Sequence, residues 1–138
     1  MVKDNLKKIG ILGGSFDPPH KGHLYISKQS IKLLKLNKVI WAITKKNPIK
    51  KSPFFSFMLR KKLCNKIIKR HKKIQLKHYE DKLKSKTSIA LLEFLQRTNK
   101  YEIFFIIGSD NLINFHKWKN YKALLKLCNL VVFSRKGF

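Results

Sequence analysis

Acidic residues are scarce in this sequence, and their scarcity sets its charge. Seven Asp and Glu residues stand against 32 Lys and Arg in 138 residues, giving a formal net charge of +25. A field of that sign attracts phosphate and nucleic acid whatever the fold. Arg makes the bidentate contacts of nucleic-acid readers, but here it occurs only as Arg60, Arg70, Arg97 and Arg135. We therefore interpret the charge as lysine at solvated positions and expect no specific nucleic-acid partner.

Cysteine is rarer still, with two residues, and no long apolar run occurs. Cys64 and Cys128 have no CxxC spacing and imply no disulfide framework, so their apolar neighbours predict small buried side chains in a reducing compartment. No stretch approaches the roughly 18 consecutive apolar residues of a membrane span. The N-terminal "MVKDNLKK" also has no apolar signal core. We expect a cytoplasmic protein without a membrane partner.

The length and the hydrophobic pattern predict one α/β domain. A chain of 138 residues, 43% of them hydrophobic, can bury one core, so we expect residues 1–138 to form a single domain. Short apolar runs alternate with helical periods along the whole chain. The predicted strands are 9–12, 38–43, 74–76, 102–107 and 129–133. The predicted helices are 23–36, 56–71, 87–98 and 111–127, the last with a break near Phe115–His116. This alternation is typical of a Rossmann-like, doubly wound parallel sheet flanked by helices.

The stretch "GGSFDPPHKGH", residues 13–23, follows the first predicted strand. In open parallel sheets, ligands bind beyond the carboxyl ends of the strands. Gly13 and Gly14 have no Cβ, so a ligand can approach the backbone there, and the amides at the following helix start can face phosphate. The spacing matches neither GxGxxG nor GxxxxGK[ST], so two glycines alone indicate a nucleotide only weakly.

Two histidines strengthen this interpretation. His20 and His23 lie three residues apart at a helix start and can face the same way over the glycine turn. Imidazoles placed there can donate hydrogen bonds to phosphate oxygens and stabilise charge in a transition state. The alternative is that His20 is a turn residue and His23 a helix-start residue bonded to backbone. Zinc is disfavoured, because no third ligand lies near and no HExxH occurs.

The same stretch resembles the signature GG[TS]FDPxHxGH of the HxGH nucleotidyltransferases and, within them, of the nicotinate-nucleotide adenylyltransferases. Two further segments resemble that family in the same order along the chain, namely "WAITKKNPIK" (41–50) and "FFIIGSDNLINFHKW" (104–118). The combination covers nearly the whole chain. The resemblance implies transfer of an adenylyl group from ATP to nicotinate mononucleotide, giving deamido-NAD and pyrophosphate.

The resemblance also implies roles for single residues. The residues implied to bind ATP are Gly13, Gly14, Ser15, Phe16, His20, His23, Gly108 and Asp110, and His20 and His23 are implied to be catalytic. The residues implied to bind the mononucleotide are Asn47, Lys50, Thr87 and Trp118. Three of these have plainer alternatives. Asp110 could cap a helix, Trp118 could be a core aromatic with Tyr121, and Lys50 could be one more solvated lysine.

The implied reaction needs no protein nucleophile, because the mononucleotide's phosphate attacks the α-phosphorus of ATP. The sequence accords with this, since it offers no Ser–His–Asp or Cys–His arrangement at recognisable spacing. Catalysis would then consist of positioning and charge stabilisation. Mg²⁺ would bridge the ATP phosphates, mostly through waters, because carboxylates are few.

The sequence departs from the family pattern in two places. Of the usual Tyr-Thr-x-x-Thr segment only Thr87 is present, in "KTSIA". The family also continues past the fifth strand to a Ser-Ser/Thr-x-x-Arg segment that holds ATP phosphates, whereas this sequence stops at Phe138. We therefore expect that phosphate contact to be missing, which would weaken activity and leave apolar surface that favours a homo-oligomer.

Three other functions remain open at this point. One is a sister adenylyltransferase that acts on phosphopantetheine or nicotinamide mononucleotide, although such sister enzymes commonly have Thr in place of the first His, where this sequence has His20. Another is a weakly active or inactive nucleotide-binding remnant. The third is a basic nucleic-acid-binding module on the same fold.

Overall fold

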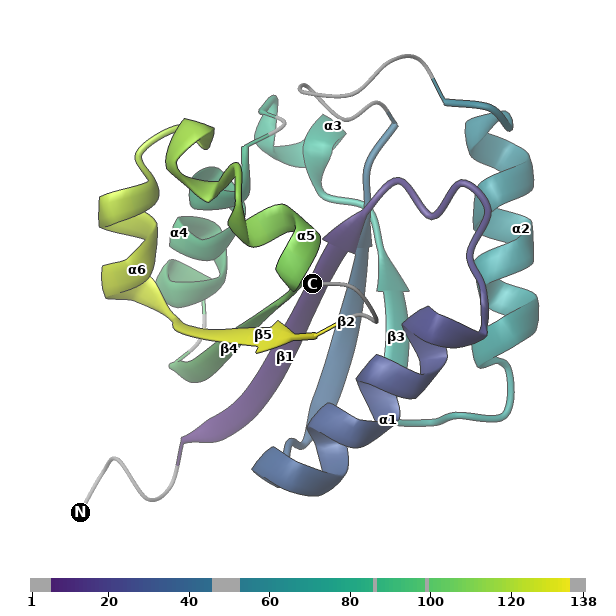
Figure 1. The fold of residues 1–138 in the computed structure, drawn as a ribbon, viewed down its shortest axis with the longest axis horizontal. Helices are drawn as coiled ribbons and strands as arrows, with labels where there is room; N and C mark the ends of the chain where they lie inside the picture. The colour runs from purple at the N-terminus through teal and green to yellow at the C-terminus, as the bar shows by residue number, and fades with distance from the viewer. Residues whose placement is uncertain (1–5, 46–52, 86, 99, 135–138) are drawn as a thin grey trace.

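The computed structural model describes residues 6–45, 53–85, 87–98 and 100–134, and a parallel sheet lies at its centre (Figure 1). The sheet has five strands in the order β3-β2-β1-β4-β5, and every neighbouring pair is parallel. The strands are β1 (Lys7–Gly14), β2 (Lys38–Ile43), β3 (Ile74–Lys77), β4 (Tyr101–Gly108) and β5 (Asn129–Phe133). The predicted doubly wound α/β sheet is therefore confirmed.

Helices cover both faces of the sheet (Figure 1). The helical segments are α1 (Lys21–Leu34), α2 (Phe57–Ile68), α3 (Glu80–Leu83), α4 (Ser88–Thr98), α5 (Ser109–Leu112), the 3-10 turn η2 (Phe115–Lys117) and α6 (Tyr121–Leu127). Two apolar clusters follow the alternation of side chains along β1. Ile9 and Ile11 pack with α4 and α6 on one face, while Leu12 packs with α1 and α2 on the other. Within the described ranges, no helix is long and apolar enough to cross a membrane.

The region between β4 and β5 differs from its prediction. A single helix over 111–127 was expected, with one break near Phe115–His116. The structure instead has α5, η2 and α6 as separate pieces. Asn120 has a φ of 52°, in the left-handed region, and begins α6 from there. Asn tolerates that conformation better than most residues, so the chain turns before α6 and the helical period is broken. The short helix α3 was not predicted.

The two cysteines differ in burial. Cys64 is fully buried on α2, and this burial raises the pKa of its thiol to about 12. Cys128 is half-buried and its Sγ donates to the Leu124 carbonyl (3.4 Å); burial raises its pKa to about 11. The prediction of a buried, unpaired thiol is confirmed for Cys64 and holds only in part for Cys128.

Ser27 lies between Leu24 and Ile31 on the inner side of α1 and is fully buried. Its Oγ accepts a hydrogen bond from Trp41 Nε1 (2.7 Å) and donates to the His23 carbonyl (2.8 Å). The indole of β2 is thereby attached to the first turn of α1. A small polar residue occurs at this apolar position because the Trp41 N–H needs an acceptor away from water.

We predict that Ser27→Ala lowers the free energy of unfolding by about 1–3 kcal/mol, because it leaves the buried Trp41 N–H without an acceptor. Ser30→Ala is the matched control on the same helix. Ser30 is equally buried, but its Oγ has no hydrogen-bond partner in the described part of the chain, so this change should leave stability equal or higher. Urea unfolding of both variants measures the difference. Equal losses in the two variants would contradict the role given to Ser27.

Candidate active site

The carboxyl ends of β1, β2 and β4 meet at one edge of the sheet. Gly13 pairs with Ala42 and Gly14 with Ile43, after which the Thr44 N–H donates to the Gly14 carbonyl (2.9 Å). A Cβ built on Gly13 would approach only the Ala42 carbonyl, at 4.0 Å. The protein's own packing therefore leaves room for a side chain at this exposed position. The open backbone at Gly13 is a surface that a ligand can reach.

Residues 13–20, which we call the glycine–histidine loop, lead from β1 into α1. Within this loop Phe16 has a φ of 51° and a side chain that is 2% exposed. Its ring stacks on Trp41 with centroids 4.9 Å apart and lies 4.7 Å from the ring of His23. A left-handed bulky residue is unfavourable by itself, so burial of the ring stabilises this loop conformation.

His20 and His23 hold each other at the start of α1. His20 is the N-cap, and its Nδ1 accepts from the Gly22 N–H (3.0 Å). His23 Nδ1 accepts in turn from the His20 N–H (3.1 Å), and the two ring centroids are 4.1 Å apart. This arrangement is a capping box built from two imidazoles. The alternative of backbone-bonded histidines is therefore correct for the Nδ1 atoms.

The capping bonds fix which nitrogen of each histidine carries the proton. A nitrogen that accepts a backbone hydrogen bond is unprotonated, so in the neutral ring the proton is assigned to Nε2. Both Nε2 atoms are then hydrogen-bond donors. The capping of α1 therefore engages the Nδ1 atoms, which is compatible with the phosphate-binding role predicted for the same side chains.

A pocket of about 50 Å³ lies beside the loop, between the strand ends and the segments α3 and α4. Its wall includes Gly13, Ala42, Thr44, Glu80, Thr87 and Phe105. Gly13 and Thr87, far apart in the sequence and both predicted site residues, are thus brought together. Thr44 Oγ1 and Glu80 Oε2 are buried and have no hydrogen-bond partner among the described residues. Unpaired polar atoms in a pocket wall are suited to a polar ligand.

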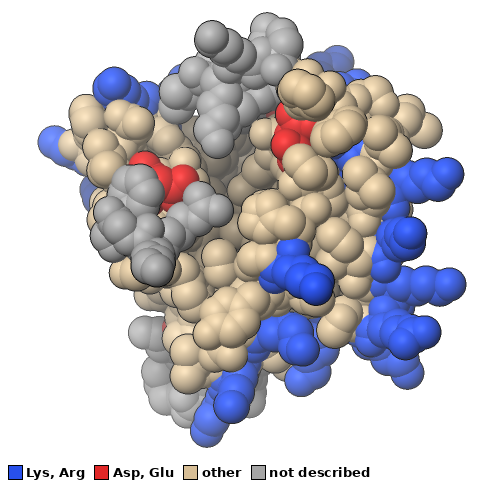
Figure 2. All heavy atoms as spheres, turned by 45° about the vertical axis from the view of Figure 1, so that its right-hand side comes forward, with Lys and Arg blue, Asp and Glu red and all other residues tan. Residues whose placement is uncertain are grey.

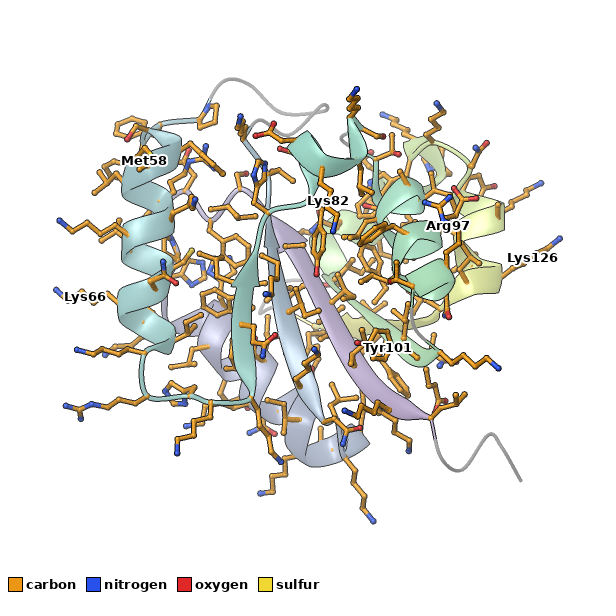
Figure 3. The ribbon with its side chains drawn as sticks, turned by 180° about the vertical axis from the view of Figure 1, so that it is seen from behind. Met58, Lys66, Lys82, Arg97, Tyr101 and Lys126 are labelled. Atoms are coloured by element: carbon orange, nitrogen blue, oxygen red, sulfur yellow. The ribbon has the colours of Figure 1, made fainter. Side chains whose placement is uncertain are left out.

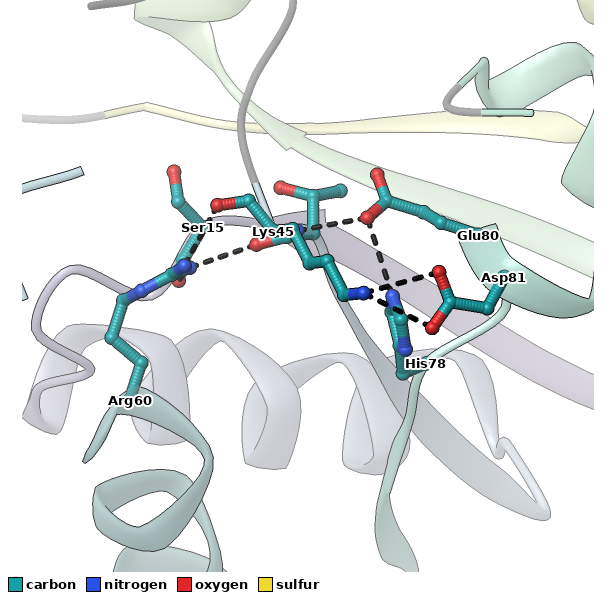
Figure 4. A network of polar contacts seen from close by, with 7 residues as sticks. Ser15, Lys45, Arg60, His78, Glu80 and Asp81 are labelled. Carbon is teal, nitrogen blue, oxygen red and sulfur yellow. Dashed lines mark hydrogen bonds and ion pairs between the residues drawn. The ribbon is translucent and has the colours of Figure 1, made fainter. Parts of the chain in front are cut away.

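A polar network joins this pocket to the glycine–histidine loop (Figure 4). Glu80 Oε1 accepts from the Lys45 N–H (2.8 Å) and lies 3.3 Å from His78 Nε2. Lys45 Nζ pairs with Asp81 (3.1 Å), and this hydrogen bond holds the pKa of the Asp81 carboxyl below its usual value. On the other side, the guanidinium of Arg60 donates to carbonyls of Ser15, Thr44 and Lys45.

Sequence reasoning missed Arg60 and Glu80. Arg60 was interpreted only as one cation among many, although it precedes Cys64 and Ile68 at intervals of four residues. That spacing places all three on the inner face of α2, where they are indeed buried. The signal for Glu80 was weaker. Its only distinction in the sequence is that acidic residues are few, and it lies in a segment where no helix was predicted.

Comparison with known proteins identifies the family. Residues 11–138 match the family model described as cytidylyltransferase-like. A curated relative from Pelagibacter ubique (strain HTCC1062), named as a nicotinate-nucleotide adenylyltransferase, is 53% identical over 131 residues, covering 95% of this chain and 73% of the relative. The chain belongs to the nicotinate-nucleotide adenylyltransferase family. The resemblance inferred from its motifs is confirmed.

Solved structures share the fold. A nicotinate-nucleotide adenylyltransferase structure from Vibrio parahaemolyticus superposes with a TM-score of 0.73 at 27% identity, covering 94% of this chain and 77% of that one. The Plasmodium falciparum nicotinic acid mononucleotide adenylyltransferase, solved in complex with NaAD, gives a TM-score of 0.74 and covers 96% and 77% of the two chains. Its identity is 20%, so it shows the fold alone.

The other residues predicted from the adenylyltransferase motifs have mixed outcomes. Gly108 is the last residue of β4, the strand beside β1, and it is the N-cap of α5. Asp110 lies in the first turn of α5, so the alternative that Asp110 is the N-cap is wrong. Trp118 is half-buried and packs on Phe105 and Phe115, with ring centroids 5.8 and 5.1 Å apart, as its core alternative predicted. Contacts of these residues with a nucleotide stay predictions.

Two of the residues that the resemblance assigns to the mononucleotide, Asn47 and Lys50, lie outside the described residues, as does Arg135. Thr87 is described. Its Oγ1 accepts from the Ala90 N–H (3.4 Å) at the start of α4 and lies 3.0 Å from Ser85 Oγ. Thr87 therefore has a structural role in addition to its place in the pocket wall.

The positive charge is spread over the outer surface of the adenylyltransferase. In Figure 2, Lys and Arg side chains line the right-hand and lower margins, and uncharged surface occupies much of the centre. Seen from behind, Lys66 on α2 and Lys126 on α6 point away from the sheet on opposite sides (Figure 3). Both are exposed, as are Lys62 and Arg97. This distribution is consistent with lysine at solvated positions.

The donor set of the site bears on metal binding. Over residues 6–45, 53–85, 87–98 and 100–134, no group of three or more His, Cys, Asp or Glu side chains could hold a metal ion. Asp17, the acidic residue of the glycine–histidine loop, accepts hydrogen bonds from the backbone N–H groups of Phe54 and Phe55. The described side chains therefore do not form a protein cage for a metal ion.

We predict that His20→Ala and His23→Ala each lower turnover by about 10²-fold or more, the size of effect expected when one charge-stabilising donor is lost. Because each ring also caps α1, each change should cost about 1 kcal/mol of stability as well. His20→Asn separates the two roles: Asn is a good N-cap, so it should restore stability but not turnover. Steady-state kinetics and thermal unfolding measure both effects. Turnover near that of the unmodified chain in His20→Asn would remove His20 from the chemistry.

Proposed function

We infer that this chain catalyses adenylyl transfer from ATP to nicotinate mononucleotide, giving deamido-NAD and pyrophosphate. Membership of the family supports the reaction. The observation that carries the site is the pair of imidazoles beyond the carboxyl end of β1, whose Nδ1 atoms accept backbone hydrogen bonds and which therefore carry their protons on Nε2. Such donors suit the phosphate oxygens of ATP.

The proposed chemistry is an in-line displacement. A phosphate oxygen of the mononucleotide attacks the α-phosphorus of ATP, and the bond from that phosphorus to the bridging oxygen of the β-phosphate breaks. Pyrophosphate leaves with the electron pair. His20 and His23 donate hydrogen bonds from Nε2 to the phosphate oxygens as negative charge develops on them. Gly13, Gly14, Ser15 and Phe16 present backbone to the nucleotide.

We propose that the mononucleotide binds over the open mouth of the pocket beside the loop. It opens next to Gly13, so a nucleotide held there would lie near the phosphates bound by the histidines. Thr87 and Trp118 would contact it from the described part of the chain, and Asn47 and Lys50 from outside it. Gly108 and Asp110, at the end of β4, would contact the adenosine of ATP.

Nucleotidyltransferases of this kind generally use a divalent metal, and we propose Mg²⁺ for this chain. Mg²⁺ prefers oxygen ligands and retains several waters, which agrees with a site that offers few carboxylates. Held by the phosphates of ATP, it would neutralise charge and orient the triphosphate. No side chain of the protein is assigned as its ligand.

The test is pyrophosphate release from ATP with either nicotinate mononucleotide or nicotinamide mononucleotide. We expect turnover with the nicotinate compound, and a loss of turnover by at least about 10²-fold when EDTA replaces Mg²⁺, because the triphosphate charge is then not neutralised. Turnover with nicotinamide mononucleotide alone would reassign the substrate. Failure with both mononucleotides under saturating Mg²⁺ would refute the proposed function.

A further inference from the structure

Arg60 is the one charged residue fully buried among those described. It is 1% exposed, and the described residues include no carboxylate that pairs with it. Removing a cation from water costs several kcal/mol unless hydrogen bonds compensate. An apolar residue at this position of α2 would pack beside Cys64 and Ile68 without that cost. The guanidinium therefore needs an explanation beyond packing.

Within the described part of the chain, Arg60 makes four hydrogen bonds, all of them to backbone carbonyls. Nη1 donates to Ser15 (2.6 Å) and Thr44 (2.8 Å), Nη2 donates to Lys45 (2.7 Å) and Nε donates to Phe55 (3.0 Å). Because every acceptor is a carbonyl, these bonds fix the path of the main chain and depend little on the side chains there. Figure 4 shows the guanidinium between the loop that carries Ser15 and the end of β2.

The position of these bonds relative to the sheet is informative. The β1–β2 ladder ends at the pair Gly14 and Ile43, with one more bond from the Thr44 N–H to the Gly14 carbonyl. Beyond this point no ladder bond joins the two strands among the described residues. A single nitrogen, Arg60 Nη1, binds both the Ser15 and the Thr44 carbonyls there. Arg60 thus continues the connection of β1 to β2 past the end of the sheet.

The two segments joined by Arg60 serve different substrates in the proposed function. Ser15 belongs to the glycine–histidine loop, which we assign to ATP. Thr44 lines the pocket that we assign to the mononucleotide, and Lys45 is fixed from its other side by Glu80. We propose that Arg60 is a positioning residue, which aligns the attacking phosphate with the α-phosphorus by holding these two segments together. This inference rests on the proposed function.

The physical basis is the sensitivity of in-line transfer to distance. A misplacement of about 1 Å of a reacting group can cost about 10²-fold in rate without preventing binding. Each substrate alone contacts mainly one of the two segments, so relaxing the link should change its affinity little. The loss should therefore appear in kcat, and the dissociation constants should be nearly unchanged.

The experiment compares Arg60→Lys and Arg60→Met with Arg70→Met, an exposed arginine just after α2 that serves as the matched control. Lysine keeps the charge, but its single ammonium cannot span carbonyls on three segments as the planar guanidinium does. We measure kcat by pyrophosphate release per folded molecule, and the dissociation constants of ATP and of nicotinate mononucleotide separately by calorimetry. All measurements are made well below the melting temperature of each variant.

For Arg60→Lys we expect kcat to fall by about 30-fold or more, each dissociation constant to change by less than about threefold, and the control to match the unmodified chain. An unchanged kcat per folded molecule would overturn the proposal. So would a loss of affinity for either substrate as large as the loss of kcat. If both Arg60 variants are unfolded under conditions in which Arg70→Met is folded, Arg60 serves the stability of the fold, and the proposal is overturned. An unmodified chain without turnover would instead refute the proposed function.

Discussion

The parallel pairing of β1 with β2 on one side and with β4 on the other is the constraint on which the site depends. It places the carboxyl ends of three strands at one edge, where the chain leaves β1 for α1. The strand order reverses there, and crossovers run to opposite faces, so the edge stays open to a ligand. Gly13, Thr44 and Gly108 reach this edge because the ladder fixes their register. The chemistry assigned to them depends on that backbone geometry.

Beyond the ladder, the loops are held by charged side chains bonded to backbone groups. Asp17 accepts from two N–H groups before α2, Glu80 accepts from the Lys45 N–H, and Arg60 donates to four carbonyls. Hydrogen bonds to charged groups are stronger than neutral ones. A chain with so few acidic residues can form few ion pairs. Backbone carbonyls are abundant in any chain, so they can accept hydrogen bonds from a buried cation where no carboxylate is available. This explains how a cation as large as Arg60 is compensated without a carboxylate.

The sequence predicted the strands and the glycine–histidine loop well because their signals are local. Apolar runs mark the strands, and the motif that begins at Gly13 is contiguous. The interruption between α5 and α6 was only partly predicted, since the left-handed turn at Asn120 depends on a single residue inside a helical period. The roles of Arg60 and Glu80 were not predicted, because each arises from residues up to 45 positions apart that only the folded sheet brings together. Which ring nitrogen of each histidine caps α1 likewise could not be predicted, because it depends on the orientation of the rings.

Long-range and short-range electrostatics have separate functions in this site. Both proposed substrates are anions, so a net charge of +25 raises their local concentration and speeds their encounter, an effect that salt screens over about 8 Å at physiological ionic strength. That field has no directional precision, because exposed lysines such as Lys66 and Lys126 lie on opposite sides of the molecule. In-line attack requires alignment to within a fraction of an ångström, which follows from short hydrogen bonds at fixed angles. The capping of α1 by His20 and the carbonyl bonds of Arg60 are interactions of that second kind. In the proposed function, changing an exposed lysine would therefore alter mainly the encounter with substrate, whereas changing a charged group bonded to the backbone at the end of β1 would also displace the reacting phosphates.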